Sequence, residues 1–425
     1  MNNPASVATV RIHPAKRSRR FAWMAKCCLA CLSGLIAVKL GDMLFGSVYQ
    51  VRQRHLLRLM PDSEFRHHSS EFDYVFRTNA LGFRGPDLPF QKPDGARRII
   101  VVGDSFVAGN GVADDHVFTT RLAELFQDSS RAVNRQSVNP IEVVNLGRAG
   151  TSTVRELDLY ESFGRRFHPD VVILAYFLGN DLAEIMHEHT RSELESFHPQ
   201  GVLRRATYAL APNCYLHLAM WRLSTRAKQE ISATSEQQQE TDVRIEAAAQ
   251  GRSPEDAVKR YRALPEAIRK CVAAGDLSER RIIDACVDPE SLVLALDPAD
   301  AEFHPAWSRT EDHLQFLQRA VTQDGARLVM VAIPAPFQIE RRSLEFHRDL
   351  GYAVRDEWLH SEPRVARALG DWAERNGVPC LNLTDDLRRS NGPLYFVEDS
   401  HFTPAGHERA AQLIASFLER EGLCE

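Results

Sequence analysis

The sequence lacks several short motifs that mark common nucleotide, metal and redox sites. It has no Gly-Lys-Ser/Thr tripeptide, which argues against a P-loop, and no His-x-x-x-His pair of the kind that binds zinc on a helix. Outside the N-terminal apolar stretch it has no Cys-x-x-Cys, so neither a zinc ribbon nor a thioredoxin-type centre is indicated. An excess of positive charge is also missing, since the formal net charge is −5. We therefore expect no cofactor and no nucleic-acid partner.

One segment does carry closely spaced metal-binding side chains. His187–Glu188–His189 could bind a metal ion from a strand or loop, but its spacing is not the one that metallohydrolases use on a helix. We expect no metal site there.

The N-terminus is basic and then apolar. Five Lys or Arg residues between positions 11 and 20 precede Phe21–Val38, a stretch in which Lys26 is the only charge. This pattern predicts a cytoplasmic tail over residues 1–20 and a single-pass signal anchor over 21–38, followed by a stalk and lead-in over 39–96. We expect an inner-membrane protein whose remaining chain lies in the periplasm or outside the cell.

A cleaved signal peptide, with Cys27–Val38 as its apolar core, is the alternative. No small-x-small cleavage site follows at the right distance, because Lys39, Leu40 and Asp42 occupy that zone. A lipoprotein reading of Cys31 is weaker still, since the residues before it match a lipobox poorly. We favour the uncleaved anchor.

The rest of the chain alternates between strand-like and helix-like segments. Strands are expected at 98–102, 141–146, 171–177, 327–333 and 378–383. Most are continuous apolar runs, as in a parallel sheet covered on both faces. Helical patterns separate several of them, at 118–126, 154–167 and 312–320, and a last helix begins with Thr403 as its cap and Pro404 in its first turn. Alternation of this kind predicts a doubly wound α/β fold over residues 97–425.

A long interruption separates the third strand from the fourth, at about residues 183–310. Amphipathic stretches at 215–223 and 254–272 predict a helical insertion there rather than a structureless loop. Cys271 and Cys286 lie within it, and the sequence leaves open whether they form a disulfide or stay as free thiols.

Four polar segments fall at the ends of predicted strands or in the loops after them. They are Gly103–Val107, Asn145–Thr151, Leu178–Asp181 and Glu398–His401. Because open α/β sheets place their sites at the carboxyl ends of strands, we expect these segments to converge.

Their side chains are those that acyl transfer through a serine requires. The Ser105 hydroxyl needs a base, which His401 could supply, and that histidine needs a carboxylate such as Asp399 to orient it. The developing oxyanion needs fixed donors, for which the Ser105 and Gly150 N–H groups and the Asn180 carboxamide are candidates. Isolated residues of these types more often cap helices or form turns, so the prediction depends on the four segments together.

In this order the segments resemble those of the SGNH (GDSL-type) hydrolase superfamily, named after its Ser, Gly, Asn and His. Gly103–Phe106 matches the first block, with Phe where Leu is common, and Asn145–Gly150 resembles the second. Gly179–Asp181 looks like the third block and Asp399–His401 like the last. Residues 77–85 also resemble the lead-in of membrane-anchored bacterial members. The resemblance implies a three-layer sandwich around a five-stranded parallel sheet of flavodoxin-like order.

One position departs from the family pattern. Many members place the aspartate three residues before the histidine, where this chain has Glu398, whereas Asp399 stands two before. The latter spacing resembles that of SGNH-like proteins that acetylate bacterial exopolysaccharides, so we favour Asp399 and keep Glu398 as the alternative. Asp104 and Asp181 are expected to organise loops rather than to react.

Three functions follow as hypotheses. The first is a serine esterase acting on ester-linked, in particular acetyl, groups in the cell envelope. The second is an O-acetyltransferase that uses the same site to modify a polysaccharide, with a membrane protein delivering the acetyl groups. The third is a binding or scaffold protein that keeps the fold without catalysis.

Overall fold

The computed structural model describes residues 17–48, 61–132, 140–186, 202–215, 217–218 and 235–424. These residues fall into two compact units. The smaller unit contains helix α1 (Arg17–Val48) and residues 202–218, and the larger contains the rest. The predicted insertion is therefore divided between the two units.

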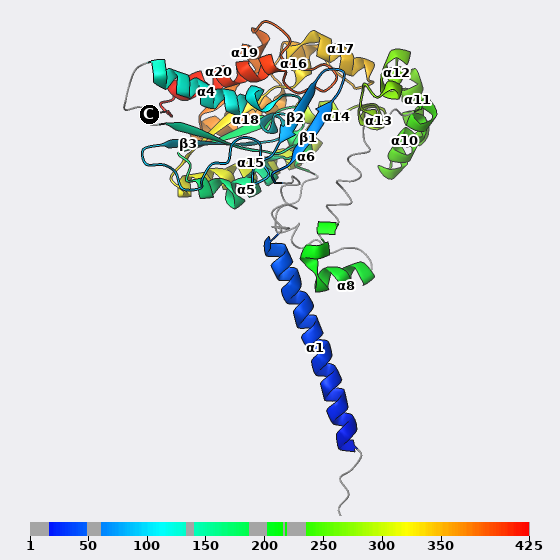
Figure 1. Ribbon diagram of the computed structural model, residues 1–425. Coiled ribbons are helices and arrows are strands. Elements are labelled where there is room, and N and C mark those ends of the chain that lie inside the picture. The colour runs from blue at the N-terminus through cyan, green and yellow to red at the C-terminus, as the bar shows by residue number, and fades with distance from the viewer. Residues whose placement is uncertain are drawn as a thin grey trace, which may run out of the picture. The chain divides into compact units, whose positions relative to one another are not determined.

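The larger unit is built on a five-stranded parallel sheet (Figure 1). Its strands are β3 (Arg97–Gly103), β4 (Ile141–Gly147), β5 (Val171–Phe177), β6 (Arg327–Ile333) and β7 (Cys380–Asn382). Their order is β4-β3-β5-β6-β7, which is the flavodoxin-like order. All five predicted strands are present, and the fold class expected from the sequence is confirmed.

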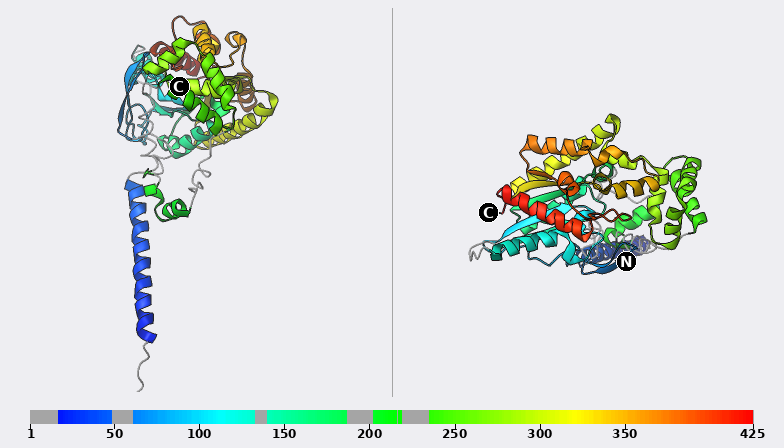
Figure 2. Two further views of the ribbon diagram at one scale, coloured as in Figure 1. Left: turned by 90° about the vertical axis from the view of Figure 1, so that its right-hand side faces the viewer. Right: turned by 90° about the horizontal axis from the view of Figure 1, so that it is seen from above.

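Helices cover both faces of this sheet. One face packs on α4 (Phe118–Ala132) and α20 (Pro404–Arg420), which lie side by side in Figure 2. The other face packs on α5 (Thr153–Ser162), α15 (Asp300–Gln323) and α18 (Arg364–Asn376). Side chains of β3 alternate between the two faces of the sheet. Ile99 and Val101 pack on the side of α4 and α20, and Ile100 and Val102 pack on the side of α5, α15 and α18.

The last helix begins as its sequence predicts. The Thr403 hydroxyl accepts a hydrogen bond from the Gly406 N–H at 3.2 Å, and Pro404 occupies the first turn. Its apolar face, which includes Ile414 and Leu418, is buried against the sheet. This helix fixes the end of the loop that carries His401.

The insertion is helical where the structure describes it. In the larger unit it forms α6 (Asp181–Glu184), α10 (Glu236–Ala249), α11 (Pro254–Ala263), α12 (Glu266–Ala274), α13 (Glu279–Val287) and α14 (Ser291–Leu296). Helices α10 to α13 share a separate small core around Tyr261 and Ile282. The helix expected over 254–272 is divided at Pro265, and most of the stretch at 215–223 lies outside the described residues. Cys271 and Cys286 are free thiols, so the bridge left open by the sequence is not formed.

The lead-in contains strands that the sequence analysis does not predict. It contains an antiparallel hairpin of β1 (Glu64–His68) and β2 (Asp73–Arg77), in which Tyr74 and Phe76 are buried. Helix α1 also continues to Val48, ten residues beyond the predicted end of the anchor at Val38.

The remaining elements are short or peripheral. They are α3 (Ser105–Ala108), α16 (Pro336–Ile339), α17 (Arg341–Asp349), α19 (Thr384–Arg388) and three 3-10 turns at Asp114–His116, Gly164–Phe167 and Asp356–Leu359.

Candidate active site

Ser105 stands at the turn between β3 and α3, at the carboxyl end of a central strand. The Asp104 carboxylate caps α3 by accepting a hydrogen bond from the Phe106 N–H at 2.9 Å. Strand β3 lies between β4 and β5, where the chain order of the sheet reverses. The turn therefore lies at the switch point at which open α/β sheets hold their ligands.

Two glycines allow this turn to pack closely on the sheet. A Cβ at Gly147 would lie 2.2 Å from the Ala108 nitrogen, and one at Gly103 would lie 2.4 Å from the Val107 side chain. Asn145 completes the contact, since its amide donates to the Val107 carbonyl at 2.6 Å. The segment Asn145–Thr151, at the end of β4, thus packs against the segment Gly103–Val107 at the end of β3 and supports it.

His401 lies in the loop before α20 and contacts Ser105. The distance from His401 Nε2 to Ser105 Oγ is 2.8 Å, and that from His401 Nδ1 to Asp399 Oδ1 is 2.5 Å. The Glu398 carboxylate turns instead to Ser70, whose hydroxyl donates to it at 2.5 Å. Of the two acidic residues that the sequence offered as partners of His401, Asp399 is the one in contact.

Glu71, which sequence reasoning missed, holds this loop from the hairpin between β1 and β2. Its carboxylate accepts the backbone N–H groups of Val397, Glu398 and Asp399 at 2.7, 2.9 and 2.9 Å. On β2, the Tyr74 hydroxyl accepts a hydrogen bond at 3.0 Å from the N–H of Gly111, which lies in the turn after α3. The hairpin therefore binds both loops that carry the proposed catalytic residues.

Arg281 on α13 holds the same loop from the insertion. Its guanidinium donates to the Ser400 hydroxyl at 3.0 Å and to the Asp399 carbonyl oxygen. Ser400 adopts a left-handed backbone conformation with φ of 73°, which is uncommon for a residue with a side chain. Contacts from the hairpin and from α13 together keep the Asp399–His401 segment in this conformation.

The charges at the site favour an ion pair between Asp399 and His401. Burial raises the pKa of Asp399, but His401 and Arg281 lower it more, to about 2. Burial lowers the pKa of His401, and the Asp399 carboxylate reverses this effect, so that the pKa lies above its ordinary value of 6.5. Asp399 is therefore ionised at neutral pH and stabilises a positive charge on the imidazole.

Two buried carboxyl groups lie behind the site. Burial raises the pKa of Asp104 to about 6, although the Phe106 N–H and His401 partly oppose it. Asp181 has a pKa well above its ordinary value because of burial and because Glu156, Asp104 and Glu184 are close. Its Oδ2 accepts the Phe177 N–H at 2.9 Å at the end of β5. Both aspartates thus organise backbone at strand ends.

Gly150 and Asn180, the other two expected oxyanion donors, follow β4 and β5. Gly150 is exposed and has a φ of 66°, a conformation that glycine adopts readily. The Asn180 carboxamide donates to Glu184 at 2.8 Å, and Asn180 is the N-cap of α6. Both residues lie at the carboxyl edge of the sheet, on either side of β3, whose end leads into Ser105.

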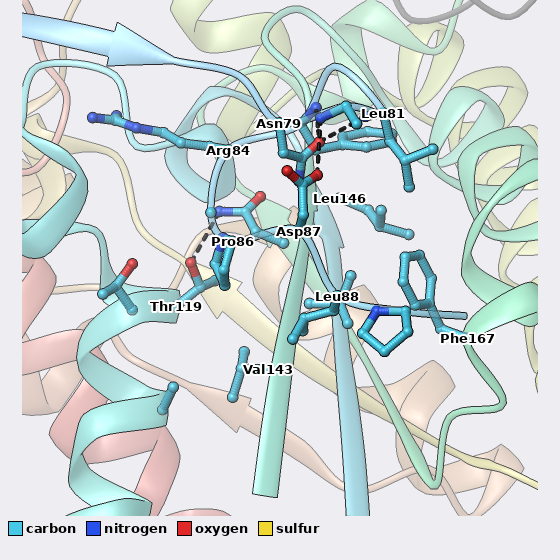
Figure 3. Close-up of a pocket in the computed structure, with 18 of the residues that line it drawn as sticks. Asn79, Leu81, Arg84, Pro86, Asp87, Leu88, Thr119, Val143, Leu146 and Phe167 are labelled. Carbon is cyan, nitrogen blue, oxygen red and sulfur yellow. Dashed lines mark hydrogen bonds between the residues drawn. The ribbon is translucent and has the colours of Figure 1, made fainter. Parts of the chain in front are cut away.

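A cavity of about 720 Å³ lies away from Ser105 and His401, between the lead-in and the edge strand β4 (Figure 3). Its wall is mainly apolar and includes Leu88, Leu146 and Phe167. The polar side chains there hold the lead-in itself: Asp87 accepts the Ala80 N–H at 2.9 Å. The lining residues do not include Ser105, His401 or Asp399.

No cluster of three or more His, Cys, Asp or Glu side chains suited to a metal ion occurs in the described ranges. His187, Glu188 and His189 lie outside those ranges.

Comparison with known proteins gives one family match. Residues 297–425 match the model described as "SGNH hydrolase-like domain, acetyltransferase AlgX". A search of curated proteins gives no match.

Several solved structures show a distant likeness. Those of TesA and of the acetyl xylan esterase AlAXEase have 10% and 11% sequence identity, each with a TM-score of 0.35. They cover 76% and 75% of this chain and 99% and 98% of their own chains. A mutant of Axe2, an acetylxylan esterase from Geobacillus stearothermophilus, has 12% identity and a TM-score of 0.34 over 76% of this chain and 94% of its own. At these scores the likenesses identify neither activity nor substrate.

The family match covers the part of the chain that contains β6, β7, the His401 loop and α20. The other three motif segments, Gly103–Val107, Asn145–Thr151 and Leu178–Asp181, precede the matched part. They follow one another in the order of the blocks described above and lie at the ends of neighbouring strands. Residues 297–425 are therefore similar to the SGNH hydrolase-like family, and the larger unit has the flavodoxin-like sheet that the resemblance in sequence implies.

Proposed function

We propose that this protein is a serine enzyme that cleaves an ester, in particular an acetyl ester, at the outer side of a membrane. The observation that carries the proposal is the chain of contacts from Asp399 through His401 to the Ser105 hydroxyl. A serine hydroxyl is a weak nucleophile until a base stands within hydrogen-bond distance. His401 meets that requirement here.

In the proposed reaction, Ser105 Oγ bonds to the ester carbonyl carbon while His401 Nε2 takes its proton. Asp399 accepts a hydrogen bond from Nδ1 and stabilises the imidazolium. The bond to the leaving alkoxy group then breaks, and His401 returns the proton to that oxygen. Water repeats the sequence on the acyl-enzyme, which releases the acid and restores Ser105.

The carbonyl oxygen becomes negative during both steps and needs fixed donors. We assign this role to the N–H groups of Ser105 and Gly150 and to the Asn180 carboxamide, which come from the ends of three adjacent strands. Only one of the two amide hydrogens of Asn180 is used by Glu184. Losing one such donor typically costs about 3 kcal/mol of transition-state stabilisation.

The N-terminal helix supports a membrane location. Phe21–Val48 is long and apolar enough to cross a bilayer, and an 18-residue window within it has a mean hydropathy of 1.9. The basic residues before it favour a cytoplasmic N-terminus, so the larger unit would face the periplasm or the exterior.

Two measurements on the full chain test the proposal. Ser105→Ala should abolish hydrolysis of a short-chain aryl ester, whereas Ser361→Ala, at an exposed serine, should leave it unchanged. A fluorophosphonate should label Ser105 in the wild type, as located by peptide mass spectrometry. Full activity in Ser105→Ala would overturn the assignment, and a folded wild type without labelling or turnover would favour a scaffold.

Transfer of the acetyl group to a polysaccharide hydroxyl is the second candidate. It differs only in the acceptor, and it is supported by the match of residues 297–425 to an acetyltransferase family model and by the two-residue spacing from Asp399 to His401. A membrane protein that delivers acetyl groups would be the expected partner. Transfer from an aryl acetate to an added glycan, measured against release of free acetate, distinguishes it from hydrolysis.

A further inference from the structure

The smaller unit joins the N-terminal helix to a segment of the insertion. Asp42 on α1 accepts the backbone N–H groups of Asn213 and Cys214 at 3.2 and 2.9 Å, and the Asn213 amide at 3.0 Å. Lys39 donates to the Ala209 carbonyl oxygen. Residues more than 160 positions apart in sequence are thus held together along one side of α1.

Packing contacts extend this attachment towards the end of α1. Asn213 lies so close to Gly46 that a Cβ there would stand 2.4 Å from it. The rings of Phe45 and His217 meet edge to face, with centroids 5.3 Å apart. Hydrogen bonds and packing therefore fasten residues 209–217 to the stretch of α1 from Lys39 to Gly46.

Helix α8 (Val202–Leu210) leads into the fastened segment and has two unlike faces. Val202, Ala206 and Ala209 lie within about 60° of each other around the helix axis, with Arg205 about 40° beyond Ala209 at the edge of this face. Arg204 and Thr207 lie on the other side. Among the described residues of this unit none covers the apolar face, since Val202 is 88% exposed and Ala206 and Ala209 are exposed. Figure 1 shows α8 beside the C-terminal end of α1.

The place of attachment indicates what covers this face. A bilayer core takes about 20 helical residues. Because the apolar stretch of α1 begins at Phe21, the charged pair Lys39 and Asp42 falls where the span reaches the outer headgroups. The face of α8 that protein leaves exposed is thus held at the depth at which amphipathic helices bind lipid.

We propose that α8 lies in the outer membrane–water interface, with Val202, Ala206 and Ala209 against the acyl chains and Arg204 among the headgroups. The segment at 209–217 then ties the insertion to the anchor at that surface. This inference rests on the proposed membrane span of α1.

Spin labels measure the depth of each position in the full chain, reconstituted in phospholipid vesicles. A background without native cysteines, checked for ester hydrolysis, receives single cysteines at Ala206 or Thr207, which differ only in the face of α8 they occupy. Leu32 in α1 and Ala248 on the exposed side of α10 serve as the lipid and water references.

Collisions with oxygen should exceed those with a water-soluble nickel chelate at Leu32 and Ala206, and the reverse should hold at Thr207 and Ala248. If the label at Ala206 is accessible to nickel while the label at Leu32 is in lipid, this inference is overturned but the proposed membrane span of α1 stands. If the label at Leu32 is accessible to nickel, the proposed membrane span itself is contradicted. Protection of Ala206 from both quenchers would mean that protein, such as a second copy, covers α8, and would also overturn it.

The fastening contact has its own test. Asp42→Ala should shift the label at Ala206 towards water, because the N–H groups of Asn213 and Cys214 lose their acceptor. Ser33→Ala, on the same helix away from the contact, should leave the depth of Ala206 unchanged. An unaltered depth in Asp42→Ala would show that Asp42 does not hold the segment at the surface.

Discussion

The Glu71 carboxylate accepts the backbone N–H of Asp399 at 2.9 Å, across 328 positions of sequence. The same carboxylate binds the two preceding N–H groups, so three donors converge on one anion. Charge-assisted hydrogen bonds of this kind are roughly twice as strong as neutral ones. The hairpin that precedes the α/β domain therefore positions the loop on which the proposed catalysis depends.

Substituting Glu71 should impair turnover while the protein stays folded. A small displacement of a catalytic group can reduce the rate about 100-fold, and we expect a loss of that order in kcat for Glu71→Ala with a smaller change in KM. Glu71→Gln should recover part of it, because one amide oxygen still accepts. Glu64→Gln, at an exposed residue of the same hairpin, is the matched control and should behave as wild type. Equal kcat in Glu71→Ala and wild type would rule out a positioning role.

Substitutions of the neighbouring residues Asp399 and Glu398 should reduce kcat by very different amounts. Asp399→Asn should reduce kcat by about 10⁴-fold, because the imidazole loses the group that fixes its tautomer and stabilises its charge. Glu398→Gln should cost far less, since that side chain contacts Ser70 and not His401. Steady-state kinetics on an aryl ester compare the two, and the reverse order of effects would assign the orienting role to Glu398.

The pH profile should respond to Arg281. His401 must be neutral to act as a base, so kcat/KM should rise with pH through its pKa, which lies above 6.5. Arg281 lowers the pKa of His401 through its positive charge. Removing that charge in Arg281→Gln should move the acid limb of the profile to higher pH. Arg280→Gln, one position away on α13, should leave the limb in place, and a shift to lower pH in Arg281→Gln would contradict the electrostatic argument.

Gly147 should tolerate no side chain. The Cβ of Gly147→Ala would stand 2.2 Å from the Ala108 nitrogen, so α3 must move away from β4. Overpacking of this kind typically costs about 1–3 kcal/mol, and the displaced α3 should also lose ester hydrolysis. Gly150→Ala meets no atom within 4 Å and bears only the strain of its positive φ. Thermal unfolding of both variants measures the difference, and equal stability would count against the close packing.

Much of the central fold could be predicted because its signals are local. The strand at 171–177 is an apolar run that ends in a turn, and its bounds agree with those of β5. The hairpin of β1 and β2 was missed because β1 is mostly exposed and lacks apolar alternation. Glu71 and Arg281 carry no local signal at all, since their partners lie in the Asp399–His401 segment far along the chain. Only the folded arrangement identifies them.

Ser105 and His401 are separated by 296 positions, and α20 holds the later one in place. During synthesis, the serine therefore emerges long before its base. The hydrogen bond between them cannot form until nearly the whole chain has been made and the last helix has docked. A chain truncated before α20 would keep His401 but lack the helix that holds its loop in place, so reactivity of Ser105 would mark completed folding.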